Sequence, residues 1–203
     1  MPLAKTFGQY ARFTVLMTPV IIPVFAVLSS TFNKNIHGIV FVSLLAAVCL
    51  LVSFIGGWGA PPSTQAGPAC YIFGGGGLGG WMGQAGNNSP DWHALILSFS
   101  LAYLTSGMFW AGDPHISLIF LLVLWMFLDA FIRGRAPLHC VNAADVIWGW
   151  VVGAATGMAG YLAMHMIEGM YDPPLSITYF SPSVNLEKCG LDGVKFTCTG
   201  DGS

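Results

Sequence analysis

The chain has 203 residues, of which 55% are hydrophobic and 8% are charged, and its mean hydropathy is +0.69. Soluble domains carry about 25% charged residues, so this composition excludes an ordinary soluble protein and indicates an integral, multi-pass membrane protein. The net charge is −2 with seven Lys and Arg residues, which leaves no basic face and excludes nucleic acid as a partner.

Six segments are predicted to span a membrane, because each has about 20 mostly apolar residues. The five strongly apolar segments are at about 12–31, 37–56, 93–111, 116–133 and 144–167. The N-terminal stretch "MPLAKTFGQYARF" has no small-residue cleavage site, so we expect it to begin the first helix and not to be a removed signal. The predicted fold class is therefore all-α, a polytopic membrane helix bundle with about six transmembrane helices.

The third predicted span is the Gly-rich segment 66–84, "AGPACYIFGGGGLGGWMGQ". Glycine costs about 1 kcal/mol relative to alanine inside a helix. In lipid, however, small residues allow helices to pack closely, and Gly75 and Gly79 have the G-x-x-x-G spacing. We expect a tightly packed span; a re-entrant segment sheltered by protein is the alternative.

The residues after the last apolar segment are more polar. Residues 1–170 are predicted to form the transmembrane domain and 171–203 an extramembrane tail, with a strand in "SITYF" (176–180). Cys189 and Cys198 lie in the polar stretch "EKCGLDGVKFTCTG". They either close a short loop through a disulfide, which would place the tail in an oxidising compartment, or remain free thiols.

The ionisable residues gather on one predicted face of the membrane. With six spans, the N-terminus, 57–65, 112–115 and the tail share a first face, and 32–36, 85–92 and 134–143 share a second face. The residues that fall on or next to the second face are His37, Asp91, His93, Arg133, Arg135, His139 and Asp145. Lys and Arg occur on both faces, so the positive-inside rule gives no orientation.

Ionisable residues at membrane depth are costly and are typical of functional sites. Asp129 precedes Arg133 by four residues, so the two side chains are predicted to pair on one helix face. The alternative for each residue is structural. Arg133 and Arg135 are typical interface anchors, and Asp145 is a favourable acid near the start of a helix.

Two motifs resemble the type-2 phosphatidic acid phosphatase superfamily. The family's last signature has Ser-Arg, five residues, His, three residues and Asp, and it is similar to "RGRAPLHCVNAADVIWGWVVG", where Arg133 and His139 keep the Arg-to-His interval. The family's preceding signature, Pro-Ser-Gly-His-Ala, resembles "PDWHA" at Pro90, His93 and Ala94. The resemblance covers about residues 90–153.

This resemblance implies a site for a lipid phosphate. His139 would be the nucleophile, Asp145 would orient it, and His93 would protonate the leaving oxygen. Arg133, with Arg135, would bind phosphate oxygens, and Asp129 would support Arg133. Phosphoryl transfer requires these roles: an in-line nucleophile, an acid and a cation that neutralises the phosphate oxygens.

The chain departs from the family pattern at several positions. The family's first signature, a Lys followed by Arg-Pro, is absent. Asp91 and Trp92 replace the Ser and Gly of the second signature, and an ionised carboxylate there would repel a phosphate dianion. The interval from His139 to Asp145 is two residues longer than in the family.

The leading interpretation is a degenerate, non-catalytic bundle that acts as a structural subunit of a membrane assembly. Its partners would be membrane lipids and other membrane subunits, with no cofactor and no metal. An active lipid-phosphate phosphatase with a histidine nucleophile is the first alternative. A metal or haem site on His37, His93 and His139 is the second, because imidazole with nearby carboxylates suits iron, copper or zinc.

Overall fold

The computed structural model describes residues 2–56, 90–112, 114–134, 142–170, 189–192 and 195–198. Its elements, in chain order, are α1 (Pro2–Phe32), α2 (His37–Gly56), α4 (Trp92–Trp110), α5 (Ile116–Gly134), α6 (Ala143–Glu168), β1 (Cys189–Asp192) and β2 (Lys195–Cys198). Each of these five helices is long and apolar enough to cross a membrane. The predicted all-α membrane bundle is therefore confirmed. The Gly-rich span 66–84 and the strand 176–180 lie outside the described residues.

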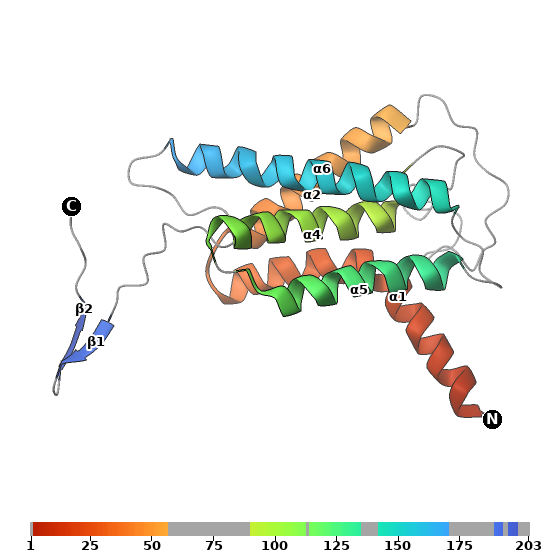
Figure 1. Ribbon diagram of the computed structural model, residues 1–203, viewed down its shortest axis with the longest axis horizontal. Coiled ribbons are helices and arrows are strands. Elements are labelled where there is room, and N and C mark those ends of the chain that lie inside the picture. The colour runs from red at the N-terminus through yellow and green to blue at the C-terminus, as the bar shows by residue number, and fades with distance from the viewer. Residues whose placement is uncertain are drawn as a thin grey trace.

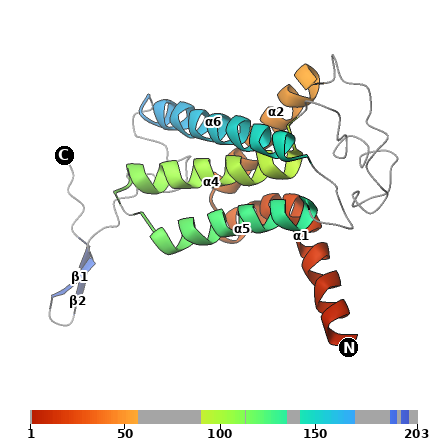
Figure 2. The same ribbon diagram turned by 45° about the vertical axis from the view of Figure 1, so that its right-hand side comes forward.

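Helix α4 is the central element of the bundle. It lies between α6 and α5 in both views (Figures 1 and 2), and its Phe99 and Tyr103 are fully buried. Phe41 of α2 packs against both rings, with centroid distances of 5.7 Å to Phe99 and 5.4 Å to Tyr103. Tyr161 of α6 packs edge-on against Tyr103 at 5.6 Å. These aromatic rings form the middle of the core.

Helices α4 and α6 run in the same direction and touch through a stripe of glycines. A Cβ atom on Gly149 would lie 2.6 Å from the carbonyl oxygen of Asp91, and one on Gly157 would lie 2.5 Å from that of Phe99. A Cβ atom on Gly153, which lies between them, would clash with the Leu95 carbonyl and the Ser98 hydroxyl. The missing side chains let the two backbones approach closely, which is how small residues promote helix packing in lipid.

The described helices have two ends, and their packing shows which residues share an end. The colours of α2 and α4 run in opposite directions along the bundle (Figure 1), so these helices are antiparallel, and Phe41 in the second turn of α2 accordingly meets Tyr103 in the second half of α4. Helix α2 therefore ends at the same end of the bundle at which α4 begins (Figure 1). We call this the Asp91 end, and the opposite one the His37 end.

Helix α1 begins at the Asp91 end as well. The buried Ser30 closes the turn between α1 and α2, because its hydroxyl donates to Asn35 Oδ1 at 2.8 Å and accepts from the Gly38 N–H at 2.7 Å. This turn lies at the His37 end. Pro19 and Pro23 lie inside α1, and the N-terminal part of α1 is directed away from the bundle (Figure 1).

This arrangement corrects the predicted faces. His37 was expected to share a face with His93, and this is wrong, because α2 and α4 are antiparallel and His37 begins one of them while His93 lies in the first turn of the other. The expectation assumed that the chain crosses the membrane once between α2 and α4. The end of α2 and the beginning of α4 instead lie at the same end of the bundle (Figure 1). The N-terminus consequently shares an end with Asp91.

The tail contains a small β-hairpin that the sequence analysis did not predict. Strands β1 and β2 pair antiparallel, with Cys189 opposite Cys198 and Asp192 opposite Lys195. Gly193 and Val194 connect the strands.

Candidate functional site

The first turn of α4 is fixed by Asp91. Its backbone is extended, and its Oδ2 accepts a hydrogen bond of 2.9 Å from the Ala94 N–H, which makes Asp91 the N-cap of the helix. Aspartate is among the preferred N-cap residues because its carboxylate satisfies an amide that has no partner within the helix. The Asp91 N–H donates to the Asp145 carbonyl oxygen at 3.0 Å. The beginnings of α4 and α6 are thereby joined.

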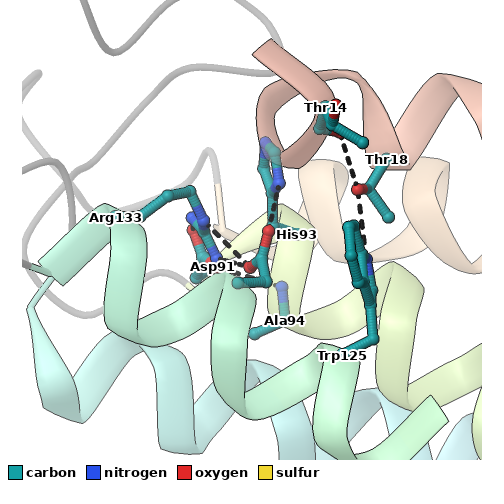
Figure 3. A network of polar contacts seen from close by, with 8 residues as sticks. Thr14, Thr18, Asp91, His93, Ala94, Trp125 and Arg133 are labelled. Carbon is teal, nitrogen blue, oxygen red and sulfur yellow. Dashed lines mark hydrogen bonds and ion pairs between the residues drawn. The ribbon is translucent and has the colours of Figure 1, made fainter. Parts of the chain in front are cut away.

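Arg133, in the last turn of α5, binds the same carboxylate from the opposite side. Its Nη1 donates to Asp91 Oδ1 at 2.8 Å and its Nη2 donates to Asp91 Oδ2 at 2.7 Å, as Figure 3 shows. Two parallel, charge-assisted hydrogen bonds are the strongest geometry available to an arginine and a carboxylate. One ion pair thus links the end of α5 to the start of α4.

Asp129 is the second carboxylate on the guanidinium. Its Oδ2 accepts from Arg133 Nε at 2.9 Å and from Nη2 at 2.6 Å, which confirms the pairing predicted from the four-residue spacing. Its Oδ1 lies 3.3 Å from His93 Nδ1. The Asp129 carboxylate therefore stands between Arg133 and His93. We call Asp91, His93, Asp129 and Arg133 the charged cluster.

The charged cluster is shielded from solvent. The exposed fraction is 1% for the Asp129 side chain, 3% for Arg133, 12% for Asp91 and 13% for His93. The two carboxylates and the one guanidinium have a formal net charge of −1. Burial raises the pKa of the Asp91 carboxyl, but the hydrogen bonds and charge of Arg133, the His93 charge and the Ala94 N–H together hold this pKa below its ordinary value.

Few of the N–H donors of Arg133 remain available to a ligand. A guanidinium has five N–H donors; here Nε donates once, Nη1 once and Nη2 twice to the two aspartates. Four of the five donors are engaged in this way, so a phosphate could bind through two or more of them only by displacing a carboxylate. Asp129 already occupies the place between His93 and Arg133 where a bridging anion would sit.

Not every predicted site residue is placed. His93, Asp129 and Arg133 are brought together, and Asp145 lies in the first turn of α6, where its backbone contacts Asp91. Arg135 and His139 lie outside the described residues, so the roles predicted for them stay predictions.

Asp91 is the member of the charged cluster whose role the sequence analysis missed. It was interpreted as an obstacle to phosphate, whereas the structure makes it a helix cap and a partner of Arg133. One signal was available in the sequence: an aspartate directly before an apolar helical run is a typical N-cap.

A metal or haem held jointly by His37, His93 and His139 is not possible in this fold. His37 and His93 lie at opposite ends of the bundle, because they begin two antiparallel helices of 20 and 19 residues. Within the described segments, no three His, Cys, Asp or Glu side chains are grouped closely enough to hold a metal ion.

A second pair of ionisable residues lies at the His37 end. His165 Nδ1 is 3.4 Å from Glu168 Oε2, and the His165 ring packs against Trp110 with a centroid distance of 4.7 Å. His165 and Glu168 belong to the last turn of α6, and the His165 ring also contacts α4 through Trp110.

Comparison of the chain with protein-family models, with curated proteins and with solved structures gives no match.

Proposed function

We propose that the chain is a non-catalytic, structural subunit of a membrane assembly, and that the charged cluster joins its helices at one membrane interface. The observation that carries this proposal is the engagement of Arg133 by two buried carboxylates. A phosphatase needs a cation that is open to substrate phosphate, whereas the Arg133 guanidinium gives four of its five N–H donors to aspartates, as expected of a structural ion pair.

The attachment of α5 supports the same proposal. Among the described residues of α5, the buried ones are Asp129 and Arg133, so α5 is held to the bundle mainly through its charged pair. The other side of α5 presents exposed apolar side chains, including Phe120 and Leu124. In a membrane, such a face contacts lipid chains or the helices of another subunit.

The alternative function, a lipid-phosphate phosphatase, is suggested by the sequence resemblance. His93 and Arg133 come from different helices and contact one carboxylate, so the two groups are close enough to bind one phosphate if Asp129 were displaced. An active enzyme would therefore require the charged cluster to open when substrate arrives.

A turnover assay separates these two functions. The purified chain in mild detergent would be offered phosphatidic acid and a diphosphate lipid, with an active lipid phosphatase in the same micelles as the positive control. We expect no release of phosphate above that of the His139→Ala variant. Release that depends on His139 would overturn the structural proposal.

Native electrophoresis tests the assembly itself. After extraction in mild detergent, a subunit should migrate with partner chains, at a mass well above that of the 21.6 kDa chain in its micelle. Quantitative extraction as a lone monomer would contradict the proposal.

A further inference from the structure

Because the structure shows which helix ends lie together, the basic residues at each end of the bundle can be counted. At the Asp91 end lie the N-terminal part of α1, which carries Lys5 and Arg12, and the end of α5, with Arg133 and then Arg135. At the His37 end, the short connections carry Lys34. The remaining two basic residues, Lys188 and Lys195, lie at least 20 residues beyond the end of α6.

The positive-inside rule weighs Lys and Arg in short loops and within about 15–20 residues of the spans, and it gives little weight to acids. On this count four basic residues lie at the Asp91 end and one at the His37 end. The rule therefore places the Asp91 end in the cytoplasm. Helix α6 runs from the Asp91 end to the His37 end (Figure 1), so on this orientation α6 ends on the side of the membrane opposite the cytoplasm.

The β-hairpin in the tail gives an independent indication of the same side. Cys189 and Cys198 are register partners at its open end. Residues directly opposite in an antiparallel pair have Cα atoms about 4.5–5.5 Å apart, and a disulfide requires about 4.4–6.8 Å. An isolated two-stranded hairpin is marginally stable in water, so a covalent link at its open end would stabilise the strand pairing.

We propose that the chain is oriented with its charged cluster at the cytoplasmic interface and its tail in an oxidising compartment, where Cys189 and Cys198 form a disulfide. The two thiols lose two protons and two electrons as the S–S bond forms. A protein disulfide of the oxidising compartment takes up these electrons by thiol–disulfide exchange and becomes a dithiol. This inference does not rest on the proposed function, because it uses only helix direction, charge and strand register.

Thiol counting tests the disulfide. The full chain is made in cells, trapped in acid, denatured, and treated with a polyethylene-glycol maleimide before and after reduction. Reduction should expose two more thiols in the wild-type chain than in Cys189→Ser, and Cys198→Ser should behave like Cys189→Ser. Wild-type labelling that does not increase on reduction would overturn the disulfide, because all five thiols of the chain would then already be free before reduction.

Glycosylation mapping tests the orientation separately, through acceptors of the form Asn-x-Ser/Thr. Glu187→Thr completes an acceptor that begins at Asn185 in the tail. Pro62→Asn completes one that ends at Thr64, between α2 and α4, and the wild type has its own acceptor at Asn87. In microsomal membranes, Glu187→Thr should gain one endoglycosidase-sensitive glycan, whereas Pro62→Asn and the wild type should carry none. A glycan on Pro62→Asn, or none on Glu187→Thr, would overturn the orientation.

Discussion

Arg133 shows how a single charged side chain can be kept inside an apolar bundle. An isolated buried charge is very unfavourable, and Arg133 is 3% exposed, but two carboxylates receive its donors within 2.6–2.9 Å. Each aspartate has a further partner, the Ala94 amide for Asp91 and the His93 ring for Asp129. Each charged group has hydrogen-bond partners among its neighbours, and this explains how the charged cluster can be buried in the bundle.

The first prediction concerns the shape of the guanidinium. Arg133→Lys keeps the charge, but lysine presents a single ammonium and cannot bind Asp91 with two parallel hydrogen bonds while also bridging to Asp129. We expect the free energy of unfolding in mixed micelles to fall by about 1–3 kcal/mol, the typical cost of hydrogen bonds to charged groups. Unchanged stability would mean that charge alone holds the cluster.

The second prediction is a pH dependence at Asp91. Since Arg133 and the other partners of Asp91 hold the pKa of its carboxyl below the ordinary value, the carboxylate stabilises the folded state above that ordinary value. This stabilisation is lost as the pH falls through the lowered pKa. Thermal unfolding of the wild type should therefore become easier below about pH 4.

The matched variant for this pH dependence is Asp91→Asn. It should be less stable at neutral pH and should lose less stability than the wild type between about pH 5 and acidic conditions near about pH 3. If the stability of the two proteins fell equally with pH, Asp91 would not contribute to the pH dependence of unfolding.

The helices depend on two different kinds of contact. Helix α6 is joined to α4 by close backbone packing at Gly149, Gly153 and Gly157, a contact made without large side chains. Helix α5 is held through Asp129 and Arg133 and through one hydrogen bond of 3.3 Å from Trp125 Nε1 to Thr18 Oγ1 of α1, which is also drawn in Figure 3.

The third prediction tests the glycine contact. Gly153→Ala places a methyl group against the Leu95 carbonyl and Ser98, and it should cost about 1–3 kcal/mol of stability through overpacking. Gly160→Ala is the matched control in the same helix, because its Cβ would lie 3.7 Å from the nearest atom, an ordinary contact. Equal effects of the two substitutions would show that the α4–α6 contact is looser than described.

The helices could be predicted from the sequence because each is indicated by residues close together along the chain. Hydropathy over about 20 residues located all five described helices within a few residues, apart from the N-terminal extension of α1. The Asp129–Arg133 pair followed from a four-residue spacing. The Asp91–Arg133 ion pair joins residues 42 positions apart, and nothing local to either residue indicates the other.

At the scale of the whole molecule, one wrong assumption changed the predicted arrangement. Counting spans required a crossing between α2 and α4, which placed His37 beside His93. Helices α2 and α4 run in opposite directions and therefore begin at opposite ends (Figure 1). Once the helix ends are assigned, most of the basic residues near the helices fall at the Asp91 end, and this unequal distribution is the basis of the orientation that we propose.

The molecule is a helix bundle whose helices are joined at the Asp91 end by the charged cluster and in the middle by packed aromatic rings. The charged cluster joins α4 and α5 and lies next to the start of α6. If its role is structural, the damage done by removing Arg133 comes from the two carboxylates that remain buried without a counter-charge.

The stability of Arg133→Ala, compared with that of Arg133→Ala combined with Asp91→Asn and Asp129→Asn, tests this most directly. The single variant should lose about 3–5 kcal/mol of unfolding free energy in mixed micelles, because it strands two buried carboxylates. The triple variant should recover much of that loss, since it leaves no uncompensated charge. Near-wild-type stability of Arg133→Ala would contradict a structural role for the charged cluster and would favour an arginine kept for substrate.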